Sequence, residues 1–147
     1  MNILISACLL GDRVRYDGKC KSYDISRLEK YNLISCCPEV DGGLPVPRIP
    51  AEIYHDRVMN REGKDVTKAF KKGANHALSL VKEHHIKVAI MKANSPSCSN
   101  ANIYDGTFSK TLKRGKGLTV QLLEKEGVKV FNETQLEEAF SYITTLV

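Results

Sequence analysis

The feature that most constrains the fold is an alternation of short apolar runs with longer segments of helical periodicity. The apolar runs have the length and composition of strands covered on both faces. They are residues 2–7, 32–36, 87–91 and 128–131. Helices are expected over residues 24–30, 66–83, 118–126 and 134–145. Strands that alternate with helices pair in parallel through right-handed crossovers. The pattern predicts a small three-layer α/β sheet of mostly parallel strands with helices on both faces, in a Rossmann-like arrangement.

Two stretches interrupt this alternation and are predicted to be long, ordered loops. Residues 38–56 hold four of the five prolines, and residues 93–116 form the second loop. Residues 57–65 are expected to form a small hairpin or an edge excursion. Loops of this length in a small protein are usually functional. At 147 residues, the chain is predicted to form a single domain over residues 1–147.

Three of the five cysteines follow predicted strands. Cys8 comes after the first strand, Cys37 directly after the second, and Cys98 a few residues past the third. The carboxyl ends of parallel strands face one edge of an open sheet, where ligands bind. We therefore expect these three thiols to converge there. Cys36 lies within its strand and should face the core, whereas Cys20 lies in a polar loop.

Composition favours a metal site over a disulfide framework. There is no basic leader and no apolar run long enough to span a bilayer, so we expect a cytoplasmic protein without membrane contact. Thiols stay reduced in that compartment, and five cysteines is an odd number. The net charge of +5 is only a weak sign of an anionic partner. No nucleic-acid-binding motif and no obligate protein partner is evident.

Spacing alone leaves several kinds of site open. Three thiolates suit an iron–sulfur cluster, a zinc site, or a catalytic thiol without metal. The absence of a Cys-x-x-Cys pair counts against a structural zinc knuckle. Three cysteines around a cubane cluster would leave one iron free for substrate. We favour this interpretation, followed by a metal-free thiol enzyme and then by zinc or plain core packing.

Longer motifs surround these cysteines. They are Ser-Ala-Cys-Leu-Leu-Gly at 6–11, Arg-Tyr-Asp-Gly at 15–18, Cys-Pro-Glu-Val-Asp-Gly-Gly-Leu-Pro at 37–45 with Pro47 and Arg48, Lys92, Ser-Pro-Ser-Cys at 95–98, and Tyr-Asp-Gly-Thr-Phe-Ser at 104–109. Together, and in this order from residue 3 to about residue 131, the chain resembles the short thiouracil desulfidases. That family was long catalogued only as a domain of unknown function.

The resemblance implies an oxygen-sensitive 4Fe–4S cluster on Cys8, Cys37 and Cys98, whose fourth iron takes the sulfur of a thiolated uracil. It implies that water then replaces the sulfur without net redox change and that sulfide leaves. Glu39 and Ser95 match the family's catalytic carboxylate and serine. Substrate contacts are expected from Arg48, Lys92, Ser97 and Asp105.

The chain departs from the family pattern at two positions. Ser99 stands where the family usually has glycine after the third cysteine, and Val14 stands where a further cysteine is common. Neither position is a proposed ligand. Ser99 is expected to add a side chain near the cluster and to change the shape of the pocket.

The expected function is therefore removal of sulfur from a small-molecule thiolated pyrimidine, which could be a free base, a nucleoside or a tRNA base. The short chain favours small substrates over tRNA. Two alternatives stay open. One is a non-catalytic iron–sulfur carrier or sensor, and the other is a metal-free cysteine enzyme.

Overall fold

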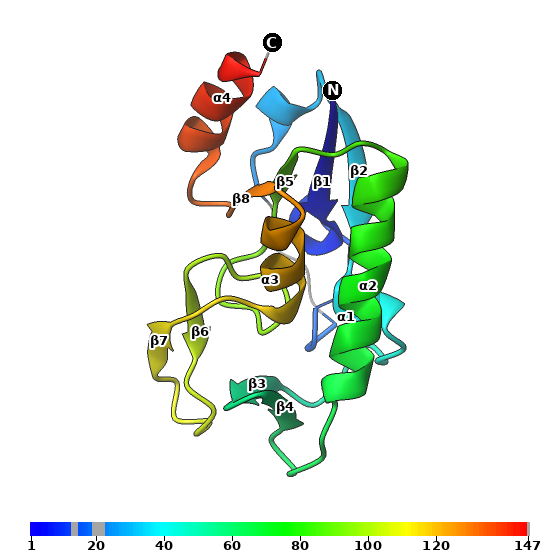
Figure 1. Ribbon diagram of the computed structural model, residues 1–147. Coiled ribbons are helices and arrows are strands. Elements are labelled where there is room, and N and C mark those ends of the chain that lie inside the picture. The colour runs from blue at the N-terminus through cyan, green and yellow to red at the C-terminus, as the bar shows by residue number, and fades with distance from the viewer. Residues whose placement is uncertain (13–14, 19–22, 147) are drawn as a thin grey trace.

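The computed structural model describes residues 1–12, 15–18 and 23–146, so Val14 and Cys20 lie outside the described residues. Its centre is a four-stranded parallel sheet with the strand order β2-β1-β5-β8 (Figure 1). The strands are β1 (Asn2–Ser6), β2 (Asn32–Cys36), β5 (Val88–Ile90) and β8 (Lys129–Phe131). The four predicted strands and the predicted α/β fold class are confirmed.

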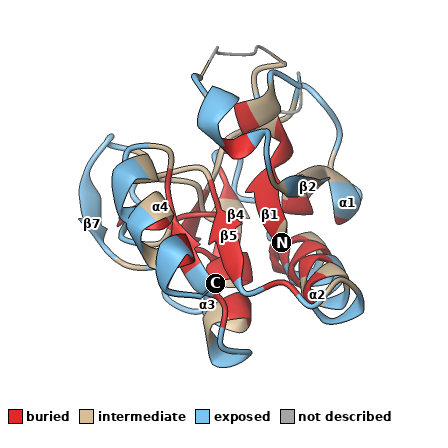
Figure 2. Cartoon of the chain, turned by 90° about the horizontal axis from the view of Figure 1, so that it is seen from above, coloured by how far each residue is buried: buried red, intermediate tan, exposed pale blue. Residues whose placement is uncertain are grey.

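Helices cover both faces of this sheet, so the predicted three layers are present. The helical elements are η1 (Ala7–Leu10), η2 (Ser26–Leu28), α2 (Thr67–Glu83), α3 (Leu118–Lys125) and α4 (Leu136–Thr145). Leu4 of β1 packs in one core with Ala77 of α2 and Leu123 of α3. Its neighbours Ile3 and Ile5 point the other way and pack with Leu28 of η2 and Ile143 of α4. Figure 2 shows the buried strands β1 and β5 in the middle of the molecule.

Two helices differ from the expectation. The predicted helix at 24–30 is a single 3₁₀ turn, η2. Helix α2 begins at Thr67, and its N-cap is Val66 rather than Asp65. Asp65 Oδ1 still accepts a hydrogen bond from the Thr67 backbone N–H at 2.9 Å. Arg57 pairs with the same carboxylate. The helix start is therefore tied to the hairpin that precedes it.

The two long loops contain short elements of their own. These are α1 (Pro38–Asp41), the antiparallel pair β3 (Ala51–Tyr54) and β4 (Arg57–Asn60), and the antiparallel pair β6 (Asn102–Tyr104) and β7 (Leu112–Arg114). Both hairpins lie beyond the carboxyl ends of the sheet strands (Figure 1). Buried Glu52 joins them, since its Oε1 accepts hydrogen bonds from the Gly106 and Phe108 amides at 3.0 and 3.2 Å. The two loops therefore cover the space beyond the carboxyl ends of the sheet strands (Figure 1).

Among the residues that the structure describes, no helix has the length and apolar character needed to cross a membrane.

Candidate metal centre

The three cysteines that follow strands lie at one edge of the sheet. We call this edge the sheet rim, and it is formed by the residues after β1, β2, β5 and β8: Cys8, Cys37, Lys92 with the loop to Cys98, and Asn132 with Glu133. Strand β1 pairs with β2 on one side and with β5 on the other, which brings the ends of these strands together. Burial is the main cause that raises the pKa of Cys98, and Glu39, Cys8 and Cys37 add to the rise.

Burial sets the protonation of these thiols. It raises the pKa of Cys8 to about 11, with the neighbouring Cys37 as the second cause. Burial also raises the pKa of Cys37, although a hydrogen bond from the Val40 backbone amide opposes the shift. Cys98 is 6% exposed, and burial raises its pKa the most. Three thiolates side by side in this setting need a positively charged partner. The iron core of a cluster is such a partner, so the donor set fits the group.

In the part of the chain that the structure describes, no three His, Cys, Asp or Glu side chains form a group that could hold a single metal ion.

The Cys37 loop is held by a close approach between two backbones. Pro38 occupies the first turn of α1, where a proline is favourable. This turn packs against α2 at Gly73, where an added Cβ would lie only 1.7 Å from the Pro38 carbonyl oxygen. Gly73 is therefore required for this contact, which fixes the loop that carries Cys37 and Glu39.

The carboxylate of Glu39 is paired with Arg48. Arg48 Nε donates to Glu39 Oε2 at 2.7 Å, and Arg48 Nη2 lies 2.5 Å from the same oxygen. Arg48 Nη1 also donates to the Pro45 carbonyl at 3.2 Å. Within the described residues, Oε1 of Glu39 accepts no hydrogen bond. The structure therefore places Arg48, expected as a substrate contact, on the expected catalytic carboxylate.

The Cys98 loop is closed by Ser95. Its Oγ accepts hydrogen bonds from the backbone amides of Ser97 and Cys98, both at 3.0 Å. Because both bonds use the oxygen, the hydroxyl hydrogen of Ser95 can still donate to a ligand. A glycine again allows a close contact, since a Cβ on Gly117 would lie 2.3 Å from the Ser97 carbonyl carbon and oxygen.

Ser6 was not singled out from the sequence, yet it touches the site. Its hydroxyl is buried and donates a hydrogen bond to Met91 Sδ at 3.6 Å, while its oxygen accepts the backbone N–H of Lys92 at 3.0 Å. Burial raises the pKa of the Cys98 thiol, and the nearby Ser6 hydroxyl opposes that rise. Ser6 therefore links the end of β1 to the end of β5 directly beneath the thiols.

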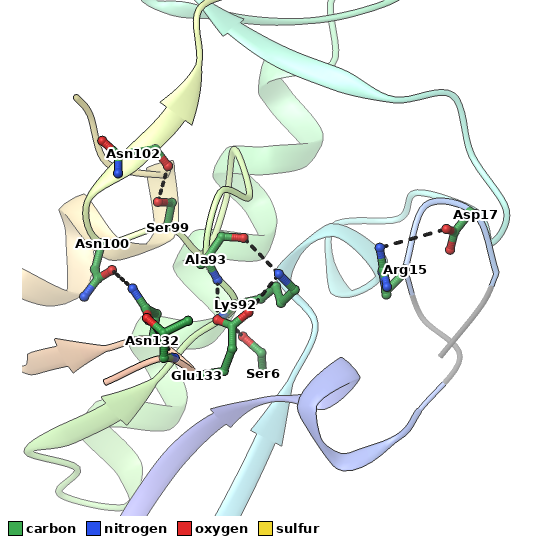
Figure 3. Close-up of polar contacts among 11 residues, drawn as sticks. Ser6, Arg15, Asp17, Lys92, Ala93, Ser99, Asn100, Asn102, Asn132 and Glu133 are labelled. Atoms are coloured by element: carbon green, nitrogen blue, oxygen red, sulfur yellow. Dashed lines mark hydrogen bonds and ion pairs between the residues drawn. The ribbon is translucent and has the colours of Figure 1, made fainter. Parts of the chain in front are cut away.

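Lys92 and Glu133 form a second ion pair at the sheet rim. Lys92 Nζ lies 2.8 Å from Glu133 Oε2, and the Ala93 amide donates to Glu133 Oε1 at 2.7 Å (Figure 3). Both charges act on Cys8, where Lys92 lowers and Glu133 raises the thiol pKa. Glu133 was missed from the sequence. It lies two residues after the fourth strand. Because residues that follow parallel strands meet at one edge of the sheet, the reasoning that predicted the cysteine positions could also have predicted Glu133.

Other expected site residues have structural partners. Ser97 has no exposed surface, and its hydroxyl hydrogen-bonds Thr119 at 2.7 Å. Asp105 Oδ1 accepts from the amide and hydroxyl of Thr107, within the turn after β6. Ser99 hydrogen-bonds the Asn102 carbonyl (Figure 3), so its hydroxyl is directed into its own loop. Cys36 is buried in the core between the sheet and α2, as expected.

The chain is similar to known proteins in sequence and in fold. A family model described as 2-thiouracil desulfurase matches residues 3–135. The uncharacterised protein YbbK of Bacillus subtilis (strain 168) is 36% identical over 148 residues, which cover 92% of this chain and 98% of YbbK. A solved structure of the 4Fe–4S-dependent thiouracil desulfidase TudS is 42% identical, with a TM-score of 0.94 and coverage of 99% of both chains.

Proposed function

The chain belongs to the 2-thiouracil desulfurase family, and from this premise we propose that it is a 4Fe–4S-dependent desulfidase. It replaces the sulfur of a thiolated uracil by oxygen from water, without net redox change, and releases sulfide. The observation that carries the proposal is that three thiols, one buried and two half-buried, follow three neighbouring strands of the parallel sheet. The resemblance to TudS in fold, over 99% of both chains, supports the same cofactor.

Cys8, Cys37 and Cys98 would hold the cluster. When bound through three thiolates, it supplies one iron as a Lewis acid for the sulfur of the substrate. The Val40 amide would donate to Cys37, and the Ser6 hydroxyl, which donates to Met91 Sδ in this structure, would donate to the Cys98 sulfur instead. Such donors stabilise negative charge on the ligating sulfurs.

Glu39 is suited to act as the general base. Arg48 holds one carboxylate oxygen, Oε2, and leaves Oε1 to take a proton from the attacking water. The proton would then pass to the ring nitrogen or to the departing sulfide. In this proposal Arg48 acts on the substrate through Glu39.

Two polar groups can orient the pyrimidine. The hydroxyl hydrogen of Ser95 is available to a carbonyl, a thiocarbonyl or the attacking water, because its oxygen already serves two amides. Lys92 can donate to the remaining carbonyl oxygen of the ring. Ser97, whose hydroxyl is bound to Thr119 of α3, and Asp105, whose carboxylate is bound to Thr107 in its own turn, would shape the loops around the substrate.

We further propose a small-molecule substrate, either the free base or its nucleoside, with a tRNA base as the competing choice. The four described cysteines are free thiols, which supports a reducing compartment such as the cytoplasm. The proposal includes a cluster that is sensitive to oxygen. No obligate protein partner enters this proposal.

The function is tested by anaerobic turnover. Iron-loaded protein is mixed with 2-thiouracil, 4-thiouracil, their nucleosides and thiolated tRNA, while thiocarbonyl absorbance and released sulfide are recorded. We expect loss of the thiocarbonyl band with one sulfide released per base. Loaded protein that leaves every thiolated pyrimidine intact would be a carrier or sensor. Colourless, air-tolerant protein with full activity would be a metal-free thiol enzyme.

A further inference from the structure

Every strand of the parallel sheet delivers a chemically active side chain to the sheet rim. Strands β1, β2 and β5 lead to the three cysteines, and β8 leads to Glu133. The proposed reaction uses the first three contributions and leaves the fourth unexplained. Glu133 is only 10% exposed, and a carboxylate that is so well buried is costly unless its partners are precisely arranged.

Both oxygens of this carboxylate bind the segment that leaves β5. Oε1 accepts the Ala93 amide at 2.7 Å, and Oε2 lies 2.8 Å from Lys92 Nζ. Lys92 is fixed at its other end as well, because its own amide donates to Ser6 Oγ. The lysine is therefore held at both its backbone and its ammonium group.

The ammonium group still has donor capacity. Lys92 Nζ donates to the Ala93 carbonyl at 3.2 Å and to Glu133, and an ammonium carries three N–H bonds. Within the described residues this leaves one N–H for a ligand. The Lys92 side chain is 24% exposed. It lies near Cys8, because the Lys92 amide donates to Ser6, two residues before Cys8, and the lysine charge opposes the rise that burial causes in the pKa of Cys8.

The turn that carries Glu133 is rigidly built. Asn132 Oδ1 accepts the amide and hydroxyl of Thr134, and Asn132 Nδ2 donates to Asn100 Oδ1 at 2.9 Å (Figure 3). Asn100 in turn donates to Gln135 Oε1 at 2.8 Å. Asn100 lies two residues after Cys98, so this amide network joins the Glu133 turn to a cysteine loop.

We propose that Glu133 is a positioning residue that aims the Lys92 ammonium at the pyrimidine carbonyl oxygen that is not exchanged. This inference rests on the proposed function and adds a specificity rule to it. Substrates that carry a second carbonyl group gain affinity from this contact. A pyrimidine-2-thione, which has no oxygen at C4, is bound without it, so its binding is insensitive to Glu133.

The test compares Glu133→Gln with Glu137→Gln, four residues farther along the chain. Glu137 pairs with Arg27 at the surface, where its side chain is 82% exposed, so it is a matched control. The readouts are iron content, uracil affinity by calorimetry, and KM and kcat for 2-thiouracil and for pyrimidine-2-thione. Uracil binding does not depend on turnover.

We expect E133Q to keep its iron and its kcat, and to bind uracil and 2-thiouracil about tenfold more weakly, as for one lost charge-assisted hydrogen bond. The KM of E133Q for pyrimidine-2-thione should equal that of the wild type, and E137Q should bind uracil normally. Lys92→Met should weaken uracil binding as much as E133Q does, and the double variant should bind uracil no more weakly than K92M alone.

Several results would overturn the inference. One is an unchanged uracil affinity in E133Q, and another is a double variant in which the losses of uracil affinity from E133Q and K92M add. A third is loss of iron from E133Q, which would mean that Glu133 supports the cluster. If E133Q does not fold, Glu133→Asp keeps the charge with a shorter reach and should still weaken uracil binding. An inactive wild-type protein would contradict both the proposed function and this inference. An active wild-type protein together with wild-type uracil affinity in E133Q would contradict only the inference.

Discussion

Arg48 holds Glu39 by a single carboxylate oxygen, with Nε at 2.7 Å and Nη2 at 2.5 Å from Oε2. The two side chains are 7% and 15% exposed, so solvent screens the pair only weakly. This contact fixes the orientation of the carboxylate and directs its second oxygen away from Arg48. A general base needs such an orientation before its substrate arrives.

Glu39→Gln should therefore separate chemistry from assembly. The amide keeps an oxygen for Arg48 but cannot accept the proton of water, so we expect kcat to fall by roughly 10²–10⁴-fold with unchanged iron content. Sulfide release and iron per chain are measured on the same preparation. An E39Q protein with normal turnover would remove Glu39 from the mechanism.

Ser95 should matter for cluster binding as well as for turnover. Ser95→Ala removes the acceptor for the Ser97 and Cys98 amides. We expect about 1 kcal/mol lower unfolding free energy and a lower iron content. Ser95→Thr retains the oxygen and should load iron normally. Thermal unfolding and iron analysis test both variants, and full iron loading of S95A would contradict the account.

Gly117 should be indispensable for the Cys98 loop. A methyl group there would collide with the Ser97 backbone, so Gly117→Ala must displace the loop. Gly127→Ala is the control, because its positive φ of 87° makes alanine unfavourable although no atom lies within 4 Å of the new Cβ. Both variants should lose stability, but only G117A should lose iron. Equal iron contents in the two proteins would refute this prediction.

Asp65 should set the acid stability of the protein before any cluster is bound. Hydrogen bonds from Thr67, and then from Arg57, lower the pKa of Asp65 from 3.8 to about 2. A carboxyl with a lowered folded-state pKa stabilises the fold above pH 3.8, and this contribution disappears as the pH falls through about 2. Thermal melts of the apo protein between pH 2 and 6 should show a smaller acid-induced loss in Asp65→Asn, with Asp56→Asn as the control. An equal loss of thermal stability in wild type and D65N as the pH falls from 6 to 2 would contradict this prediction.

The strands and the three cysteines were predictable because both depend on local patterns. Apolar runs such as Ile3–Ile5 are buried on both faces. Their continuous apolar pattern differs from the helical pattern, in which apolar residues recur on one face. Cys8 and Cys37 follow such runs directly, so the topology of a parallel sheet places them at one edge.

The supporting groups were not predictable in the same way. Ser6 and Glu133 act through partners 86 and 40 residues away, and nothing in their local sequence marks those contacts. The assignment of Arg48 to Glu39 likewise depends on how the loop between α1 and β3 closes. Ser97 lies within a cysteine motif, yet packing against Thr119 directs its hydroxyl to the interior.

Iron and sulfide analysis of anaerobically prepared protein tests the central claim most directly. The wild type and Cys36→Ala, which alters only a core thiol beside Cys37, should each contain one 4Fe–4S cluster per chain. Replacement of Cys8, Cys37 or Cys98 by serine should abolish the cluster while the chain stays folded. A folded, oxygen-free wild type without iron would contradict the account, as would a cluster that survives these three replacements and is lost with Cys36.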